Sequence, residues 1–117
     1  MQKSVRKSRT LNLNSQFTRI YKSGASCVRP TLVVYARPNN LGFNRLGVTV
    51  TKKIGKAHIR NRAKRRLREV FRQNQSFLKN GYDFVLVSRG RTPMAPFERL
   101  CEDFLFATKA IKVLKNE

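Results

Sequence analysis

The feature that most constrains this chain is a basic segment, from about Ala57 or His58 to Asn74, whose apolar residues recur at helical spacing. At about 100° per residue, these residues share one stripe of a helix. They are Ile59, Ala63, Leu67 and Val70, with Phe71 at the margin. The opposite face carries Asn61, Lys64, Arg65, Arg68 and Arg72, and the boundary carries Arg62 and Arg66. The pattern predicts a helix that buries its apolar stripe and presents a row of guanidinium groups outward.

The whole chain is strongly basic, because 26 Lys and Arg face six Asp and Glu and give a formal net charge of +20. A charge of this size repels itself in a compact state, so it indicates a polyanionic partner. Nucleic acid is the default partner, because neutralised phosphates release condensed counterions. The competing partner is an anionic membrane, but the chain has no run of about 18 apolar residues. A merely solvated basic face is the other alternative, and repulsion along the helix argues against it.

Cysteine usage and the N-terminal sequence indicate where the chain acts. Cys27 and Cys101 lie far apart and have no metal-binding spacing, which favours reduced thiols over a disulfide scaffold. The first seven residues carry positive charge without an apolar stretch behind them, so they do not resemble a signal peptide. We therefore expect a cytoplasmic protein.

Before the basic segment, the sequence predicts a helix and three strands. Asn14 or Ser15 can cap the helix, and Gly24 ends it. Residues 26–37 read as strand with a break at Pro30, which suits an edge or a bend. Turn residues at 38–42 precede a further strand at 46–51, and this pattern predicts a hairpin between the strands on either side of the turn.

After the basic segment, an apolar run at 83–88 is typical of a buried strand, and a last helix begins near Pro96 and continues to about Lys115. The order α-β-β-β-α-β-α predicts an α+β fold, a small two-layer sandwich of one sheet with helices packed against it. We expect a flexible basic arm at residues 1–10 and a single RNA-binding domain over residues 11–117.

The basic segment also carries a specific motif, Lys52-Lys53-x-Gly55-x-Ala57-x-x-Arg60-Asn61-Arg62-x-Lys64-Arg65-x-x-Arg68-Glu69. Further blocks precede and follow it in order: Ser15-Gln16-Phe17-x-x-Ile20-Tyr21-x-x-Gly24, Arg45-Leu46-Gly47-Val48-Thr49-Val50 and Tyr82-Asp83-Phe84-Val85-Leu86-Val87. Together they cover nearly the whole chain and resemble the bacterial ribonuclease P protein family. The resemblance implies a fold related to a domain of some ribosomal proteins, with a left-handed crossover into the last strand.

The same resemblance implies two RNA partners, which are the ribonuclease P RNA and precursor tRNA. The residues expected on the ribozyme RNA are Arg60, Asn61, Arg62, Lys64, Arg65 and Arg68, with Arg72 on the same face. Arginine suits this role because its planar fork binds phosphate oxygens bidentately and stacks on bases. The family also holds the single-stranded 5′ leader of precursor tRNA in a cleft between the first helix and the sheet. Phe17, Tyr21, Val33 and Tyr35 match that cleft.

These four residues can also be considered from spacing alone. Phe17 and Tyr21 are four apart on one helix face, and Val33 and Tyr35 alternate onto one sheet face. Aromatic rings beside a basic rim can stack single-stranded bases. Spacing alone favours ordinary core residues, and the resemblance reverses this for Tyr21 and Tyr35 while leaving Phe17 open.

The basic residues before the helix, Lys52, Lys53 and Lys56, are expected to hold leader or ribozyme phosphates, and the alternative is solvated loop lysines.

Nothing in the sequence indicates a catalytic or metal site within the protein. Phosphodiester hydrolysis needs clustered carboxylates with metals or a general acid–base pair, whereas this chain has six scattered acidic residues and one histidine. The resemblance implies that the RNA subunit binds the catalytic Mg²⁺, and we expect no small-molecule substrate. A structural, ribosomal-type RNA-binding protein is the main alternative. A metal-dependent nuclease acting alone and a duplex DNA binder are weaker ones.

Overall fold

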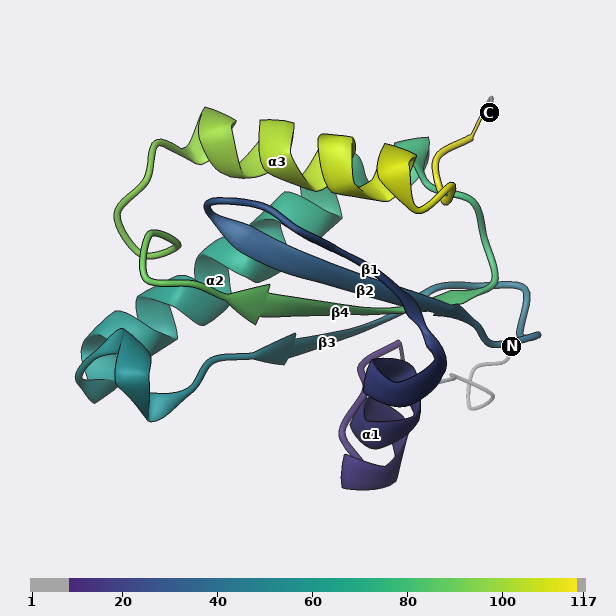
Figure 1. Ribbon diagram of the computed structural model, residues 1–117, viewed down its shortest axis with the longest axis horizontal. Helices are drawn as coiled ribbons and strands as arrows, with labels where there is room; N and C mark the ends of the chain where they lie inside the picture. The colour runs from purple at the N-terminus through teal and green to yellow at the C-terminus, as the bar shows by residue number, and fades with distance from the viewer. Residues whose placement is uncertain (1–8, 116–117) are drawn as a thin grey trace, which may run out of the picture.

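The computed structural model describes residues 9–115. Its elements are α1 (Asn14–Ser23), β1 (Ala25–Val28), β2 (Leu32–Pro38), β3 (Arg45–Thr49), the 3₁₀ turn η1 (Lys52–Ile54), α2 (Ala57–Asn74), the 3₁₀ turn η2 (Gln75–Phe77), β4 (Tyr82–Ser88) and α3 (Phe97–Ala110). The predicted order α-β-β-β-α-β-α is confirmed. The helices lie on both sides of a single sheet, with α2 and α3 on one side and α1 on the other (Figure 1).

The four strands form a mixed sheet in the order β1-β2-β4-β3. The pairs β1–β2 and β2–β4 are antiparallel, whereas β3 and β4 are parallel. The predicted hairpin between β2 and β3 is therefore wrong, because β4 lies between them. β4 is buried along most of its length and takes the interior place, since a strand that is apolar on both faces is most stable there. The tight turn lies at Pro30, where it joins β1 to β2 and pairs Val28 with Val33.

The main core lies between the sheet and the two helices α2 and α3. Alternate residues of the two central strands face it, and these are Leu32, Val34, Ala36, Phe84 and Leu86. From the helices, the apolar stripe of α2 contributes Leu67, Val70 and Phe71, and α3 contributes Leu100, Phe104 and Ala107. Ala63 is also fully buried. The predicted amphipathic division of α2 is therefore confirmed, and its basic side faces away from the core.

A second, smaller cluster lies under α1, where Leu11, Ile20 and Val85 are buried together. The segment before α1 is attached to the edge of the sheet, because Leu11 N–H donates to Leu46 O and Leu46 N–H donates to Arg9 O, both at 2.8 Å. Of the arm predicted at residues 1–10, positions 1–8 lie outside the described residues. Leu13 occupies the position before α1, so a side-chain cap by Asn14 or Ser15 is wrong.

The last helix is shorter than predicted, because α3 ends at Ala110 rather than near Lys115. Lys112 adopts a left-handed backbone conformation with φ of 65°, and Val113 N–H donates to Thr108 O. This backbone closure turns the chain, and Leu114 then pairs with Leu78 instead of extending the apolar stripe.

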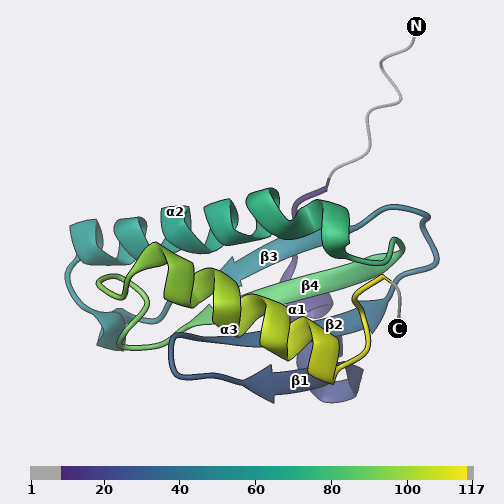
Figure 2. The ribbon, with the colours of Figure 1, turned by 90° about the horizontal axis from the view of Figure 1, so that it is seen from above.

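The crossover from β3 through α2 to β4 is left-handed, as the resemblance implied. When Figure 2 is turned so that β3 and β4 point upward with α2 toward the viewer, β4 lies to the left of β3. This arrangement departs from the right-handed rule for parallel strands. No helix within residues 9–115 is long and apolar enough to cross a bilayer.

Candidate nucleic-acid interface

The outward face of α2 carries basic side chains that the fold leaves uncommitted. Arg65 and Arg68 are exposed, and Lys64 is half-buried. Within residues 9–115, none of the three makes a side-chain hydrogen bond or ion pair, and neither does the exposed amide of Asn61. Their N–H groups are therefore available to phosphate oxygens.

Other arginines of the same helix are tied to the protein backbone. Arg60 Nη1 donates to Gly55 O at 2.7 Å, and Arg62 Nε donates to Pro93 O at 2.6 Å. Arg66 donates from Nη1 to the same Pro93 oxygen at 2.6 Å and from Nη2 to Ala95 O. Burial lowers the pKa of Arg66, and the neighbouring charge of Arg62 adds to that effect. A guanidinium has five N–H donors, so Arg60 and Arg62 keep donors for RNA while these bonds fix their orientation.

Arg72 differs from the rest of the predicted ribozyme-binding face because it has a carboxylate partner. Its Nε donates to Glu69 Oε1 at 2.9 Å, and its Nη2 donates to Glu69 Oε2. The hydrogen bond from Arg72, followed by one from Gln73, lowers the pKa of Glu69 to about 2. The charge of Arg72 is thus partly neutralised before any RNA binds.

On the other side of the sheet, the predicted aromatic residues do come together. The rings of Tyr21 and Tyr35 meet edge to face with centroids 4.9 Å apart, and Phe17 lies 6.4 Å from Tyr21. Tyr21 is 39% exposed, whereas Phe17 and Tyr35 pack against the cluster under α1. The ring of Phe17 fits because Gly47 has no side chain, since a Cβ there would lie 2.6 Å from it.

The sheet beyond α1 is open and partly apolar. Val33 is half-buried there, and its neighbour in register, Val28, is 61% exposed. Val87 lies beside Val33 from β4, and Tyr21 shares a hydrogen bond with Thr49 at the end of β3. The sequence prediction missed Val28, Val87 and Thr49. Strand alternation could have identified the two valines, but nothing local in the sequence connects Thr49 to Tyr21.

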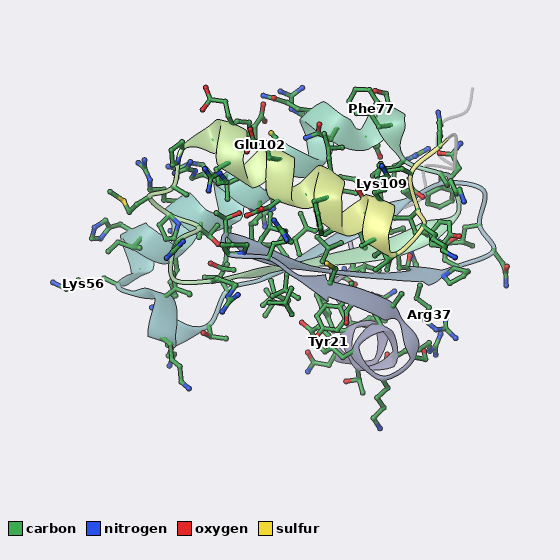
Figure 3. The ribbon with its side chains drawn as sticks, turned by 45° about the horizontal axis from the view of Figure 1, so that its top comes forward. Tyr21, Arg37, Lys56, Phe77, Glu102 and Lys109 are labelled. Atoms are coloured by element: carbon green, nitrogen blue, oxygen red, sulfur yellow. The ribbon has the colours of Figure 1, made fainter. Side chains whose placement is uncertain are left out.

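The three predicted phosphate-binding lysines are exposed but are not all brought to the aromatic rings. Lys52 and Lys53 lie in η1, shortly after Thr49. Lys56 precedes α2 and projects away from Tyr21 at the far end of the molecule (Figure 3). η1 packs against α2 and leads directly into Lys56, so all three lysines lie toward the start of α2.

The acidic residues within 9–115 do not fit a Mg²⁺ site. Asp83 binds Arg45 through both carboxylate oxygens at 2.8 Å, and Asp103 accepts from Arg29 at 3.2 Å. Within residues 9–115, no three His, Cys, Asp or Glu side chains gather in a way that could hold a metal ion. These carboxylates stabilise the fold by pairing with arginines.

Comparisons with known proteins agree with this arrangement. The Ribonuclease P family model matches residues 5–112. The ribonuclease P protein component of Natranaerobius thermophilus is 38% identical over 107 residues, which cover 92% of this chain and 93% of the relative. That of Caldanaerobacter subterraneus is 45% identical over 92 residues, which cover 79% of each chain.

Solved structures agree as well. An RNase P protein from Staphylococcus aureus superposes with a TM-score of 0.81 at 31% identity, covering 93% of this chain and all of that one. One from Thermotoga maritima gives 0.76 at 33% identity, covering 92% and 96%. The chain therefore belongs to the bacterial ribonuclease P protein family, the protein subunits of the ribonucleoprotein endoribonuclease that processes the 5′ end of precursor tRNA.

Proposed function

We propose that this subunit holds two RNAs at once, on opposite sides of its sheet. The proposal rests on one observation. The helix α2, which carries the uncommitted basic residues, and the helix α1, which carries Tyr21 of the aromatic cluster, lie on different sides of the sheet (Figure 1). Two polyanionic strands can then bind without competing for the same surface.

The ribonuclease P RNA would bind the outer face of α2. Arg65, Arg68 and Lys64 would contact phosphates directly, and Asn61 can donate to or accept from a base edge or a 2′-hydroxyl. Arg60 and Arg62 would contribute the guanidinium N–H groups that do not donate to the protein backbone. Arg72 would contribute less, because Glu69 already binds it.

The single-stranded 5′ leader of precursor tRNA would bind the open sheet face. Tyr21 offers a half-exposed ring that is fixed at its hydroxyl, and Tyr35 and Val33 continue the surface along β2. Stacking on such a platform is worth about 1–3 kcal/mol per base. Lys52 and Lys53 would hold leader phosphates at the end of β3, and Phe17 would mainly support the ring of Tyr21.

The chemistry would belong to the RNA subunit, which would hold the catalytic Mg²⁺. The protein would act through its net charge of +20, which offsets phosphate repulsion between the two RNAs and lowers the Mg²⁺ concentration that assembly needs. One RNA-binding domain from residue 11 onward would suffice, with residues 1–10 as a basic arm. The site of action would be the cytoplasm, where bacterial precursor tRNA is made.

Reconstitution tests this function. The full-length protein is combined with its cognate ribonuclease P RNA, and precursor tRNA cleavage is measured across a Mg²⁺ series. We expect cleavage at Mg²⁺ concentrations where the RNA alone is inactive. An unchanged Mg²⁺ dependence would contradict the mechanism.

The alternative of a purely structural RNA-binding protein makes a different prediction. It needs no leader surface, so the affinity of the complex for precursor tRNA would not depend on leader length. Our proposal requires that dependence, and it requires Tyr21→Ala and Tyr35→Ala to reduce it.

A further inference from the structure

Two adjoining hollows lie where the β1–β2 turn approaches the loop between β4 and α3. One, of about 470 Å³, is bordered by Arg29 and Arg89. The other, of about 450 Å³, is bordered by Met94, Ala95 and Pro96. Both share Gly90 and Arg91, so they form one continuous depression with a basic half and an apolar half. Each volume lies within the roughly 300–1,000 Å³ typical of ligand sites.

The basic half has guanidinium groups that the fold holds in place. Arg29 Nε donates to Asp103 at 3.2 Å, and its guanidinium lies 3.9 Å from the centre of the Phe106 ring. Arg89 Nη1 donates to the backbone oxygen of Arg29 at 3.0 Å. Asp103 is buried and paired with Arg29, so it partly neutralises that guanidinium and leaves Arg89 and Arg91 as the less compensated charges of this half. Arg29, Arg89 and Arg91 all border this hollow, and their combined positive charge would attract a phosphate group.

The apolar half is exposed and rests on a loop that α2 holds in place. Met94 is 76% exposed. The loop beneath it accepts hydrogen bonds from Arg62 and Arg66 at Pro93 O, and from Arg66 at Ala95 O. A thioether beside a proline ring suits the flat face of a nucleobase better than it suits water. The depression therefore adjoins the basic side of α2 without being part of its outer face.

We propose that this depression binds a single unpaired RNA nucleotide, with its phosphate between Arg29, Arg89 and Arg91 and its base against Met94 and Pro96. The inference rests on the proposed function in one respect, that the partners are RNA. Two sources present the same chemistry, which are an unstacked nucleotide of the ribonuclease P RNA and a nucleotide of the precursor tRNA leader. The β1–β2 turn connects the depression to the leader surface through Val28, and the loop contacts connect it to α2.

Three substitutions test the two halves separately. A Cβ at Gly90 would have no heavy atom within 4 Å, so Gly90→Glu adds a carboxylate at the junction without a clash, and Gly90→Gln is its neutral match. Arg91→Ala removes an exposed guanidinium, and Met94→Ala removes the apolar contact. Lys109→Ala, on the exposed side of α3, is the control for loss of a distant charge.

Each variant is measured in two assays, which are affinity for the ribonuclease P RNA across a salt series and holoenzyme affinity for precursor tRNA with long and short leaders. We expect Gly90→Glu and Arg91→Ala to weaken binding several-fold in one assay, and that assay identifies the source of the nucleotide. Arg91→Ala should flatten the salt slope by about one unit, whereas Met94→Ala should weaken binding at an unchanged slope. The ¹³C-methyl resonance of Met94 should shift when the same RNA binds.

The inference is overturned if all three variants match Lys109→Ala in both assays. If the Met94 methyl resonance did not shift on RNA binding, the proposed contact between Met94 and the base would be wrong. Arg65→Ala and Arg68→Ala, measured in parallel, separate this failure from failure of the proposed function. Losses in those two variants with an unaffected Gly90→Glu would reject the depression alone.

Discussion

The hydroxyl of Tyr21 shares a hydrogen bond of 2.7 Å with Oγ1 of Thr49, and this bond ties α1 to the end of β3. The bond fixes the hydroxyl end of the Tyr21 ring. The centroid of the Tyr35 ring lies 4.9 Å from that of Tyr21, and the two ring planes meet at 73°. Tyr21 is thereby positioned without being covered, which is what a stacking platform requires.

Replacement of Tyr21 separates stacking from the hydrogen bond. Tyr21→Ala should reduce holoenzyme affinity for precursor tRNA with a long leader by about 1–3 kcal/mol. Tyr21→Phe keeps the ring and should lose no more than about 0.5–1.5 kcal/mol, the usual contribution of one hydrogen bond. The measurement is the dissociation constant with long and short leaders. An equal loss with a short leader would show that Tyr21 acts on something other than the leader.

The basic residues of α2 should contribute unequally to ribozyme binding. Arg65→Ala and Arg68→Ala should each flatten the dependence of log affinity on log salt by about 0.7–0.9 units, the value for one lost phosphate contact. Arg72→Ala should change the slope less, because Glu69 already binds that guanidinium. Equal slopes for Arg72→Ala and Arg65→Ala would show that the ion pair opens at no cost when RNA binds.

Glu69 should act as an internal competitor for RNA phosphate. The hydrogen bond from Arg72 lowers its pKa to about 2, so it stays ionised throughout the neutral range. Glu69→Gln should therefore strengthen ribozyme binding a few-fold at low salt and steepen the salt dependence toward that of one more phosphate contact. Gln73→Ala, which removes the second donor to Glu69, is the matched control and should have little effect. Unchanged affinity in Glu69→Gln would remove Arg72 from the interface.

The local elements of this fold could be predicted from sequence, but their pairing could not. The burial of Leu67 and Val70 follows from a 3.6-residue period that lies within one segment. The place of β4 between β2 and β3 depends instead on pairing between residues that are 38 to 56 positions apart in the sequence. The turn residues at 38–42 therefore suggested a hairpin that does not form, whereas the break at Pro30 marked the one that does.

In the candidate site too, local contacts could be predicted from the sequence, whereas contacts between distant residues could not. The meeting of Phe17 with Tyr21 follows from helical spacing, and the resemblance supplied Tyr35. Nothing in the sequence around Arg62 indicates that it binds the carbonyl of Pro93, because that acceptor lies 31 residues away in a loop. Backbone acceptors leave no trace in residue type, so arginines that stabilise a loop and arginines that are free for RNA look alike in sequence.

Gly47 should be required for the position of Phe17. A Cβ at this glycine would lie 2.6 Å from the ring and 3.1 Å from Leu11, which is closer than real side chains pack. Gly47→Ala should therefore reduce the free energy of unfolding by about 1–3 kcal/mol, the usual cost of overpacking. Gly90→Ala, where a Cβ has no heavy atom within 4 Å, is the control and should change it by less than about 0.5 kcal/mol. Equal stabilities would mean that Phe17 moves freely.

Asp103 should make stability depend on pH in the acid range. Burial alone would raise the pKa of its carboxyl, but hydrogen bonds from the side chain and backbone of Thr31 and from Arg29 outweigh burial and lower it. The unfolded chain, with an ordinary Asp pKa of about 3.9, then binds the proton more readily than the folded chain does. The stability that Asp103 supplies is present above about pH 4 and is lost as the pH falls through the lower folded pKa.

Asp103→Asn tests this prediction, because it keeps the shape of the side chain and removes its charge. Its free energy of unfolding at neutral pH should be lower than that of the wild type by about 1–3 kcal/mol, since an amide cannot satisfy all three donors. The difference should shrink as the pH falls below about 4, because the carboxyl of the unfolded wild type then takes up a proton, whereas the folded one stays ionised until its lower pKa is reached. Urea unfolding followed by circular dichroism measures it, with the exposed Glu98→Gln on the same helix as the control. A difference that stays constant with pH would show that Asp103 stabilises the fold through shape rather than charge.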